Sequence, residues 1–378
     1  MEIGAILSNT YYILVLLLVV AYYFISINKN AQQVLRGNNT NIVLLFIICL
    51  VVVLIIGFRP ASREILSDTY GYTRAFLSTS PDDKVFDDGQ RGNEWLFRAT
   101  MIFCRNFTTE QGWLVFIALV YILCAMLAAI ILFKNNSYGA MLAFFSGFST
   151  YAYGVNTMRH GMAASILLFA IALCLKNNLR NYVIAAFIAI LATKVHNSVT
   201  LSIIAFVCAY FYHNLKFGIF VWLGSIIIFL VAGGFISAFM SSLDVDSRLS
   251  SYIENSYEYA RYNKTGFRLD FVVYSCMPII LGWYVIIKRK LKNRVYEILL
   301  CSYIYANSLW ITLMTAAHAD RFAYLSWYLY PFVMAYPCFA IDVWGVRQGR
   351  NGSMIILAMC IFSEFMHFIY YYSSSVKF

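Results

Sequence analysis

Three short stretches of the chain place basic, imidazole and amide groups directly beside long apolar runs. In chain order they contain Asn156, Arg159 and His160, then Lys194 and His196, and finally Arg321. Charged groups at a membrane edge are costly unless they are hydrated or paired. Arg159 opens an apolar run, where a helix N-terminus and a guanidinium would together favour an anion. We therefore expect these stretches to bind a pyrophosphate, although an arginine that reaches toward lipid headgroups would explain the same placement.

A second group of polar residues lies between the second and third apolar runs. It contains Arg59, Asp68, Tyr72 and Glu94. Asp68 and Tyr72 are four residues apart and would share one face of a helix, which either faces a substrate or is the solvated side of a helix on the membrane surface. Asp68, His196 and Glu94 are the candidates for a general base, because each can take a proton from a hydroxyl group.

No set of side chains has the spacing of a metal site. The acidic turn from Asp82 to Asp88 could hold a divalent cation, but a solvated turn has the same composition. Glu364 and His367 are not spaced as in HExxH, and the nine cysteines contain no CxxC pair. We therefore predict no metal ion and no cofactor.

The composition is that of a polytopic membrane protein. Of the 378 residues, 61% are hydrophobic and only 12% are charged, whereas a soluble domain is near half apolar and a quarter charged. This excludes a disordered chain, a disulfide scaffold and an ordinary soluble enzyme. The net charge of +10 then reflects basic loops, and we predict no nucleic-acid partner.

Twelve apolar runs predict an all-α fold with about twelve transmembrane helices. The runs are Tyr11–Ile27, Asn41–Phe58, Gln111–Phe133, Ser137–Val155, Gly161–Leu175, Asn181–Thr193, Asn197–Tyr212, Phe217–Met240, Leu269–Ile287, Ile298–Ala317, Phe322–Ile341 and Ser353–Tyr371. The runs at 161–175 and 181–193 are short, so they either tilt, or enter and leave on one side where protein covers the backbone.

The charges of the connections set the expected orientation. Turns on one side hold 13 of the 28 Lys and Arg residues and, among the acids, Glu297 and Asp342. The positive-inside rule makes this side cytoplasmic, so both termini face outward. The two long connections, 59–110 and 241–268, are then external, and residues 1–378 form a single transmembrane domain. The chain has no GxxxxGK[ST] phosphate loop, so nucleotide chemistry is not expected.

The polar motifs resemble those of the EpsG-like branch of the Wzy polysaccharide polymerases. The matching motifs are Gly57-Phe58-Arg59 with Asp68-x-x-x-Tyr72, Glu94 with its aromatic neighbours, Asn156-x-x-Arg159-His160-x-x-Ala163, the turn Ala192–Ser198, and Arg321-Phe322-x-Tyr324. The resemblance covers roughly residues 1–370. The chain departs from the family at His160, where the family usually has glutamine.

This resemblance implies a GT-C-type membrane glycosyltransferase of a surface-polysaccharide pathway. Such enzymes join undecaprenyl-pyrophosphate-linked oligosaccharides on the external face of the bacterial cytoplasmic membrane. Arg159 and Arg321 would then stabilise the leaving pyrophosphate, with Arg59 and Lys194 in support. Tyr72, Asn156 and His160 would complete the substrate-binding residues. The expected partners are the lipid-linked oligosaccharides and membrane lipid. A chain-length regulator is a further candidate partner.

Two other functions fit much of the same sequence. A flippase or transporter for lipid-linked oligosaccharides would also have about twelve spans, but common two-bundle transporters have cytoplasmic termini and a cytoplasmic central loop. An O-antigen ligase would use the same chemistry with another acceptor. A membrane acyltransferase is disfavoured, because the histidine-plus-acid pattern of that class is absent.

The orientation leads to a direct test by cysteine labelling in a background without the native cysteines. A membrane-impermeant reagent should label Ser80→Cys from outside the cell and should not label Lys290→Cys, because residue 290 lies in the most basic turn. Labelling of position 290 from outside would contradict the predicted orientation.

Overall fold

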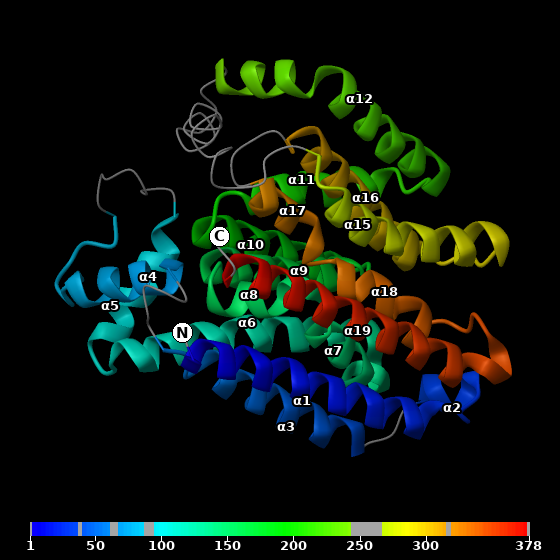
Figure 1. Ribbon diagram of the computed structural model, residues 1–378, viewed down its shortest axis with the longest axis horizontal. Helices are drawn as coiled ribbons and strands as arrows, with labels where there is room; N and C mark the ends of the chain where they lie inside the picture. The colour runs from blue at the N-terminus through cyan, green and yellow to red at the C-terminus, as the bar shows by residue number, and fades with distance from the viewer. Residues whose placement is uncertain are drawn as a thin grey trace. The chain divides into compact units, whose positions relative to one another are not determined.

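All regular structure in the described part of the chain is helical. The computed structural model describes residues 2–36, 40–60, 67–86, 94–242, 267–314 and 319–375 (Figure 1). The all-α prediction is confirmed for these residues. The helices group into two compact units, one formed by Met1–Thr200 with Met334–Phe378 and the other by Leu201–Val333.

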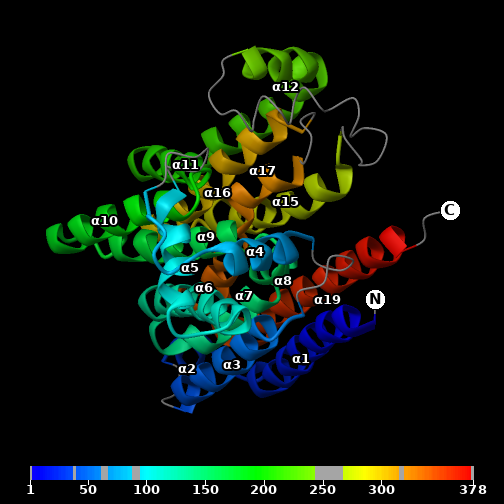
Figure 2. The ribbon, with the colours of Figure 1, turned by 90° about the vertical axis from the view of Figure 1, so that its left-hand side faces the viewer.

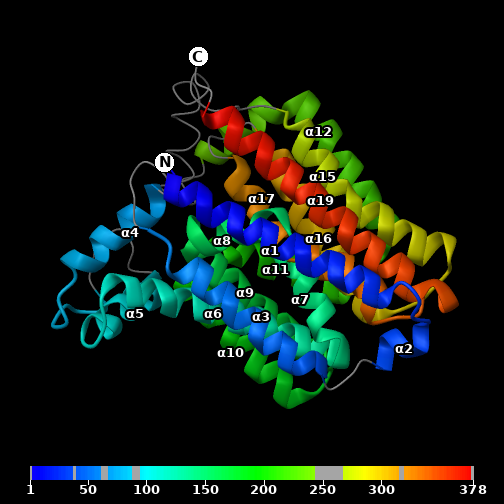
Figure 3. The same cartoon turned by 60° about the horizontal axis from the view of Figure 1, so that its bottom comes forward.

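The first unit contains the helices that carry most of the predicted site residues. They are α1 (Glu2–Ser26), α2 (Ala31–Arg36), α3 (Thr40–Gly57), α4 (Ser67–Ser78), α5 (Trp95–Arg105), α6 (Glu110–Phe133), α7 (Ser137–Phe145), α8 (Phe148–Val155), α9 (Met158–Cys174), α10 (Leu179–Val195) and α19 (Gln348–Ser375). Helix α9 packs against both α6 and α10, and Figure 2 shows α10 beside α9. Helix α1 runs along α19 (Figure 3).

Local sequence explains where two of these helices begin. The Thr109 side chain accepts a hydrogen bond from the Gly112 N–H at the start of α6. The Asn178 side chain does the same for the Asn181 N–H at the start of α10. Such N-caps satisfy backbone donors that the first turn of a helix leaves without an intrahelical partner.

Among the described residues, five helices are long and apolar enough to cross a membrane. They are Ile6–Ser26, Glu110–Phe145, Leu215–Gly233, Leu269–Lys288 and Gly345–Ile369, and the bent pair α8–α9 would make a sixth. Each predicted run is helical where it is described, but the runs at 137–155 and 322–341 are each divided into two helices. The described residues thus support a polytopic membrane protein, while the count of about twelve spans is not confirmed.

The sharp bend between α8 and α9 sets up the predicted anion site. The chain bends by 118° between the two helices. The turn between them contains Asn156 and Thr157. Glycine is required next to the bend, because a Cβ at Gly161 would overlap the backbone carbonyl oxygen of Tyr153. The close approach of α8 and α9 therefore depends on a residue without a side chain.

Helices α4 and α5 occupy the predicted external loop 59–110. In α5, Phe97 is buried while Phe103 is 59% exposed, so one face of the helix packs on the protein and another does not. Positions 87–88 of the acidic turn lie outside the described residues, as does most of the second predicted loop, 241–268.

The second unit is built around a buried polar network. Its helices are α11 (Val199–Phe211), α12 (Leu215–Ser242), α15 (Leu269–Gly282), α16 (Arg294–Thr312), α17 (Ala319–Trp327) and α18 (Tyr330–Phe339), the first and last of which cross its limits. The Asn307 side chain accepts a hydrogen bond from the Trp222 indole at 2.8 Å and donates to the hydroxyl groups of Ser275 and Ser326. The network joins α12, α15, α16 and α17, because each of these helices supplies one of its members. All four members are buried and hydrogen-bonded, so the network stabilises the packing of these helices.

Candidate active site

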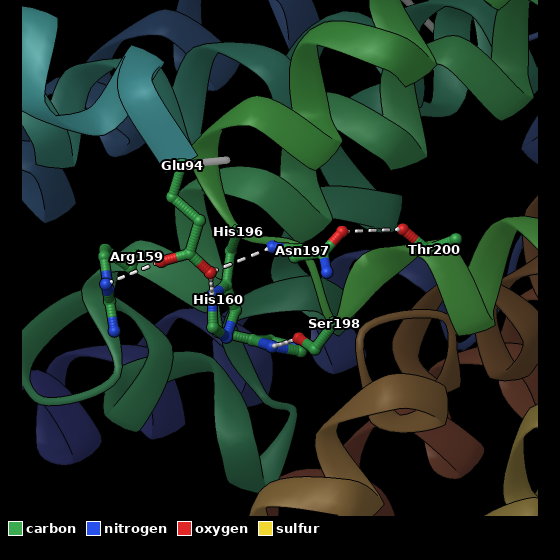
Figure 4. A network of polar contacts seen from close by, with 7 residues as sticks. All are labelled: Glu94, Arg159, His160, His196, Asn197, Ser198 and Thr200. Atoms are coloured by element: carbon green, nitrogen blue, oxygen red, sulfur yellow. Dashed lines mark hydrogen bonds and ion pairs between the residues drawn. The ribbon is translucent and has the colours of Figure 1, made fainter. Parts of the chain in front are cut away.

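A buried carboxylate, that of Glu94, is the centre of the candidate site. Its side chain is 3% exposed and accepts from three donors (Figure 4). Arg159 Nη1 lies 2.8 Å from Oε2, His196 Nδ1 lies 2.8 Å from Oε1, and the Asn197 backbone N–H donates to Oε1 at 3.1 Å. Both carboxylate oxygens are therefore engaged by donors from distant parts of the first unit.

The ends of several helices bring these groups together. Glu94 directly precedes α5, but its side chain turns away from that helix and makes no cap there. Arg159 is in the first turn of α9. His196 ends α10, with its backbone N–H on the Ala192 carbonyl oxygen. Helix ends are well suited to this role, because a side chain there can approach backbone groups that have no intrahelical partner.

Glu94 stays ionised in this environment. Burial alone would raise its pKa, but the hydrogen bond and charge of His196, the charge of Arg159 and the Asn197 N–H together outweigh burial. The net effect holds the pKa of Glu94 well below its ordinary value. At neutral pH Glu94 is therefore a negatively charged hydrogen-bond acceptor. It does not readily take up a proton.

The ionised carboxylate also fixes the histidine. A carboxylate without a proton can only accept hydrogen bonds, so Nδ1 of His196 must carry a proton. In the neutral ring this places the lone pair on Nε2. Because the His196 side chain is 18% exposed, the arrangement is that of a general base oriented by an acid.

The guanidinium of Arg159 lies over two neighbouring aromatic rings, which are edge-on to each other. Its Cζ atom is 5.3 Å from the Tyr72 ring centroid and 5.9 Å from that of Phe97, within cation–π range. Nη1 is used by Glu94, whereas Nε is buried without a hydrogen-bond partner among the described residues, as is Oδ1 of Asn156. Buried polar atoms in native proteins are normally hydrogen-bonded, so these two are hydrogen-bonding groups beside the network that the described residues leave unused.

His160 supports the site by packing against the turn that contains His196. It is 6% exposed, and its ring is stacked on that of Tyr153 and lies edge-on to His196 at a centroid separation of 5.3 Å. Its Nδ1 atom is 3.1 Å from the Ser198 hydroxyl oxygen. His160 thereby braces the turn that contains His196 and Asn197.

The other predicted residues lie at varied distances from this network. Lys194 is half-buried in the last turn of α10, two residues before His196. Asp68 is half-buried in the first turn of α4. Arg59 is fully buried. Arg321 belongs to α17 in the second unit, and its side chain lies outside the described residues.

The structure also identifies groups that sequence reasoning did not select. Asn197 and Ser198 join the site through a backbone N–H and a hydroxyl, and Phe97 supplies an aromatic face to Arg159. The two polar residues directly follow His196 in the turn, and that position is the signal that could have found them. Among the described residues, no group of three or more His, Cys, Asp or Glu side chains is arranged to hold a metal ion.

Long apolar helices with a buried acid–histidine–arginine network define a polytopic membrane protein with an enzyme-like site. The model of the EpsG family matches residues 42–378. The chain therefore belongs to the EpsG family, a Wzy-like polysaccharide polymerase family, and is a polymerase-like membrane protein. Neither the curated proteins nor the solved structures contain a significant match.

The central role of Glu94 predicts a large effect of Glu94→Gln on stability. Removing one member of a buried ion pair typically costs about 3–5 kcal/mol, and partial exposure of Arg159 and His196 reduces this to roughly 2–3 kcal/mol. Folding lowers the pKa of Glu94. The stability difference between wild type and Glu94→Gln should therefore be largest above the ordinary glutamate pKa of about 4.3 and should shrink as the pH falls below it. Unfolding in detergent at neutral and acidic pH measures both effects.

Asp83→Asn is the matched control. Asp83 pairs with Arg98 at 3.6 Å, and both side chains are more than one-third exposed, so its loss should change stability by less than about 0.5 kcal/mol. Equal stability of the two variants would show that Glu94 does not support the fold.

Proposed function

We propose that the protein is a glycosyltransferase that polymerises undecaprenyl-pyrophosphate-linked oligosaccharides into a surface polysaccharide. The observation that carries this proposal is the network in which Glu94 orients His196 and pairs with Arg159. It combines a base for a hydroxyl group with a cation for a leaving pyrophosphate. Membership of the EpsG family supports the class of reaction.

The proposed reaction needs one proton acceptor and one anion site. A hydroxyl oxygen of the acceptor sugar attacks the anomeric carbon of the donor, and the bond from that carbon to the pyrophosphate oxygen breaks. The hydroxyl proton passes to Nε2 of His196, while negative charge develops on the departing pyrophosphate. Preorganised cations stabilise this charge and lower the barrier.

Arg159 is suited to the anion site even while it is paired with Glu94. Nη1 holds the carboxylate at 2.8 Å, and the Nε–Nη2 edge of the planar guanidinium is the edge that can bind two phosphate oxygens. The buried Nε atom is then satisfied by substrate. Lys194 and Arg321 are proposed to add positive charge, and Tyr72, Asn156 and His160 to complete the binding site.

His196 is the base that the geometry favours among the three candidates. Glu94 has both oxygens in hydrogen bonds and a lowered pKa, so its proposed role is to orient the histidine and stabilise its charged form. Asp68 lies in α4 and is the second choice. The same site would serve a ligase that transfers the chain to another acceptor, whereas a flippase has no use for a base.

The location follows from the same proposal. We propose a multi-pass protein of the bacterial cytoplasmic membrane, of the GT-C type, with both termini and the site on the external side. Lipid-linked donors would reach the site by diffusion within the bilayer, so no soluble nucleotide-sugar domain is needed. A chain-length regulator is the protein partner that such a polymerase would use.

Arg159→Lys tests the proposed pyrophosphate contact. The substitution keeps the positive charge but loses the planar fork, so glycan polymerisation should fall by about tenfold or more at equal protein level. Polymer length and the amount of single-repeat lipid-linked product measure the effect. Arg98→Lys, the same change in the exposed pair with Asp83, is the control and should make full-length polymer.

Two outcomes of that experiment would redirect the proposal. Normal polymer from Arg159→Lys would remove the arginine from the pyrophosphate site. Cytoplasmic accumulation of lipid-linked units without any surface glycan would favour a flippase.

The pH dependence of turnover tests His196. If Nε2 accepts the hydroxyl proton, the wild-type rate should fall at acidic pH as the ring becomes protonated, and His196→Asn should lose roughly 100- to 10,000-fold in rate together with that acidic decline. His213→Asn, at a histidine just after α11, should leave both rate and profile unchanged. An unchanged profile in His196→Asn would move the role of base to Asp68.

A further inference from the structure

The most deeply buried charged side chain of the described residues is Arg59, just after α3. Its exposed fraction is 0%. Burial lowers the pKa of Arg59 to about 10, so the guanidinium still carries its proton at neutral pH. A buried charge of this kind persists only where its N–H groups are well satisfied.

All three nitrogen atoms of Arg59 are bound inside the protein. Nη1 donates to the Ile56 carbonyl oxygen at 2.7 Å, and Nε donates to the Thr69 hydroxyl at 3.2 Å. Nη2 donates to the thioether sulfur of Met158 at 2.9 Å. The Thr69 hydroxyl in turn donates to the Val155 carbonyl oxygen. Because Arg59 is completely buried, a substrate could reach it only if the packing around these bonds opened.

The partners of Arg59 lie on both sides of the turn between α8 and α9. Val155 is the last residue of α8 and Met158 the first of α9. Between them lie Asn156 and Thr157, and Arg159 follows immediately. Arg59 and Thr69 therefore hold the two ends of the segment that places Arg159 opposite Glu94.

The same bonds fix α4. Thr69 lies in the first turn of this helix, and Tyr72, three residues on, faces the Arg159 guanidinium at 5.3 Å. One buried arginine thus joins the end of α3, the start of α4 and the bend at α8–α9. Two of these segments reach the active-site arginine: α4 contacts it through Tyr72, and the bend leads directly into it.

We propose that Arg59 is a positioning residue that sets Arg159 through Thr69 and Met158 and does not contact substrate. The proposal rests on the proposed role of Arg159 in pyrophosphate binding. It replaces the sequence-based expectation that Arg59 itself binds the substrate. Its content is geometric, because the three bonds of Arg59 diverge to three segments and a single charge would not reproduce them.

Thr69→Val provides the cleanest test, because it removes one hydroxyl and keeps the shape of the side chain. It should weaken binding of inorganic pyrophosphate to the full-length purified protein and lower turnover by roughly 10- to 100-fold. Thr69→Ser, which restores the hydroxyl, should recover most of both. Thr73→Val is the matched control, since the buried Thr73 hydroxyl bonds only within α4, to the Thr69 carbonyl oxygen, and should leave both values unchanged.

A double-mutant cycle separates positioning from general damage. If Thr69 acts through Arg159, adding Thr69→Val to Arg159→Lys should cause little further loss of turnover. The guanidinium whose position Thr69 sets is already absent from that variant. Additive losses, or equal losses from Thr73→Val and Thr69→Val, would overturn the proposal. Normal pyrophosphate affinity in Arg159→Lys would instead contradict the proposed function on which it rests.

Arg59→Lys provides a second measurement if Thr69→Val does not fold. Lysine keeps the charge but cannot reach three diverging acceptors, so the loss should match that of Thr69→Val. Full activity of Arg59→Lys together with an inactive Arg59→Met would assign the effect to charge alone and would overturn the positioning role.

Discussion

The site depends on a single carboxylate that three positive or polar donors share. Glu94 is separated by 65 residues from Arg159 and by about a hundred from His196 and Asn197. An arginine in the first turn of a helix is opposed by the helix dipole, and Glu94 supplies the negative charge that makes this position favourable. The same charge selects the histidine tautomer. Removing it would leave a guanidinium, an imidazole N–H and a backbone N–H without their common partner.

This arrangement keeps the reactive groups in place before any substrate arrives. Arg159 is paired with Glu94 and lies over the rings of Tyr72 and Phe97, so little rearrangement would be needed to bind the proposed anion. Groups that are fixed in advance stabilise a developing charge without a reorganisation cost at the moment of reaction. His160 and Ser198 give His196 the same kind of support.

Local sequence predicts the helices well, because an apolar run has only one way to satisfy its backbone in a membrane. It does less well where a run is interrupted: Gly147 adopts an extended conformation between α7 and α8, which divides one predicted span. The expectation of an anion beside Arg159 follows from electrostatics and is met within the chain by Glu94. Sequence cannot tell an internal carboxylate from a ligand, because the pairing spans 65 residues. For the same reason the sequence places Arg59 among the substrate-binding residues, although tertiary packing buries it.

The order of the chain has a consequence for biosynthesis. Residues 201–333 separate the two parts of the first unit, and α1 packs on α19, with Tyr12 stacked on His367 at 4.2 Å. At a synthesis rate of 5–20 residues per second, α19 follows α1 by roughly 15–65 s. All residues of the Glu94 network are made within that interval, so the site can assemble while the face of α1 that α19 will cover is still open. Helix α1 must therefore persist in the bilayer for tens of seconds without its final neighbour.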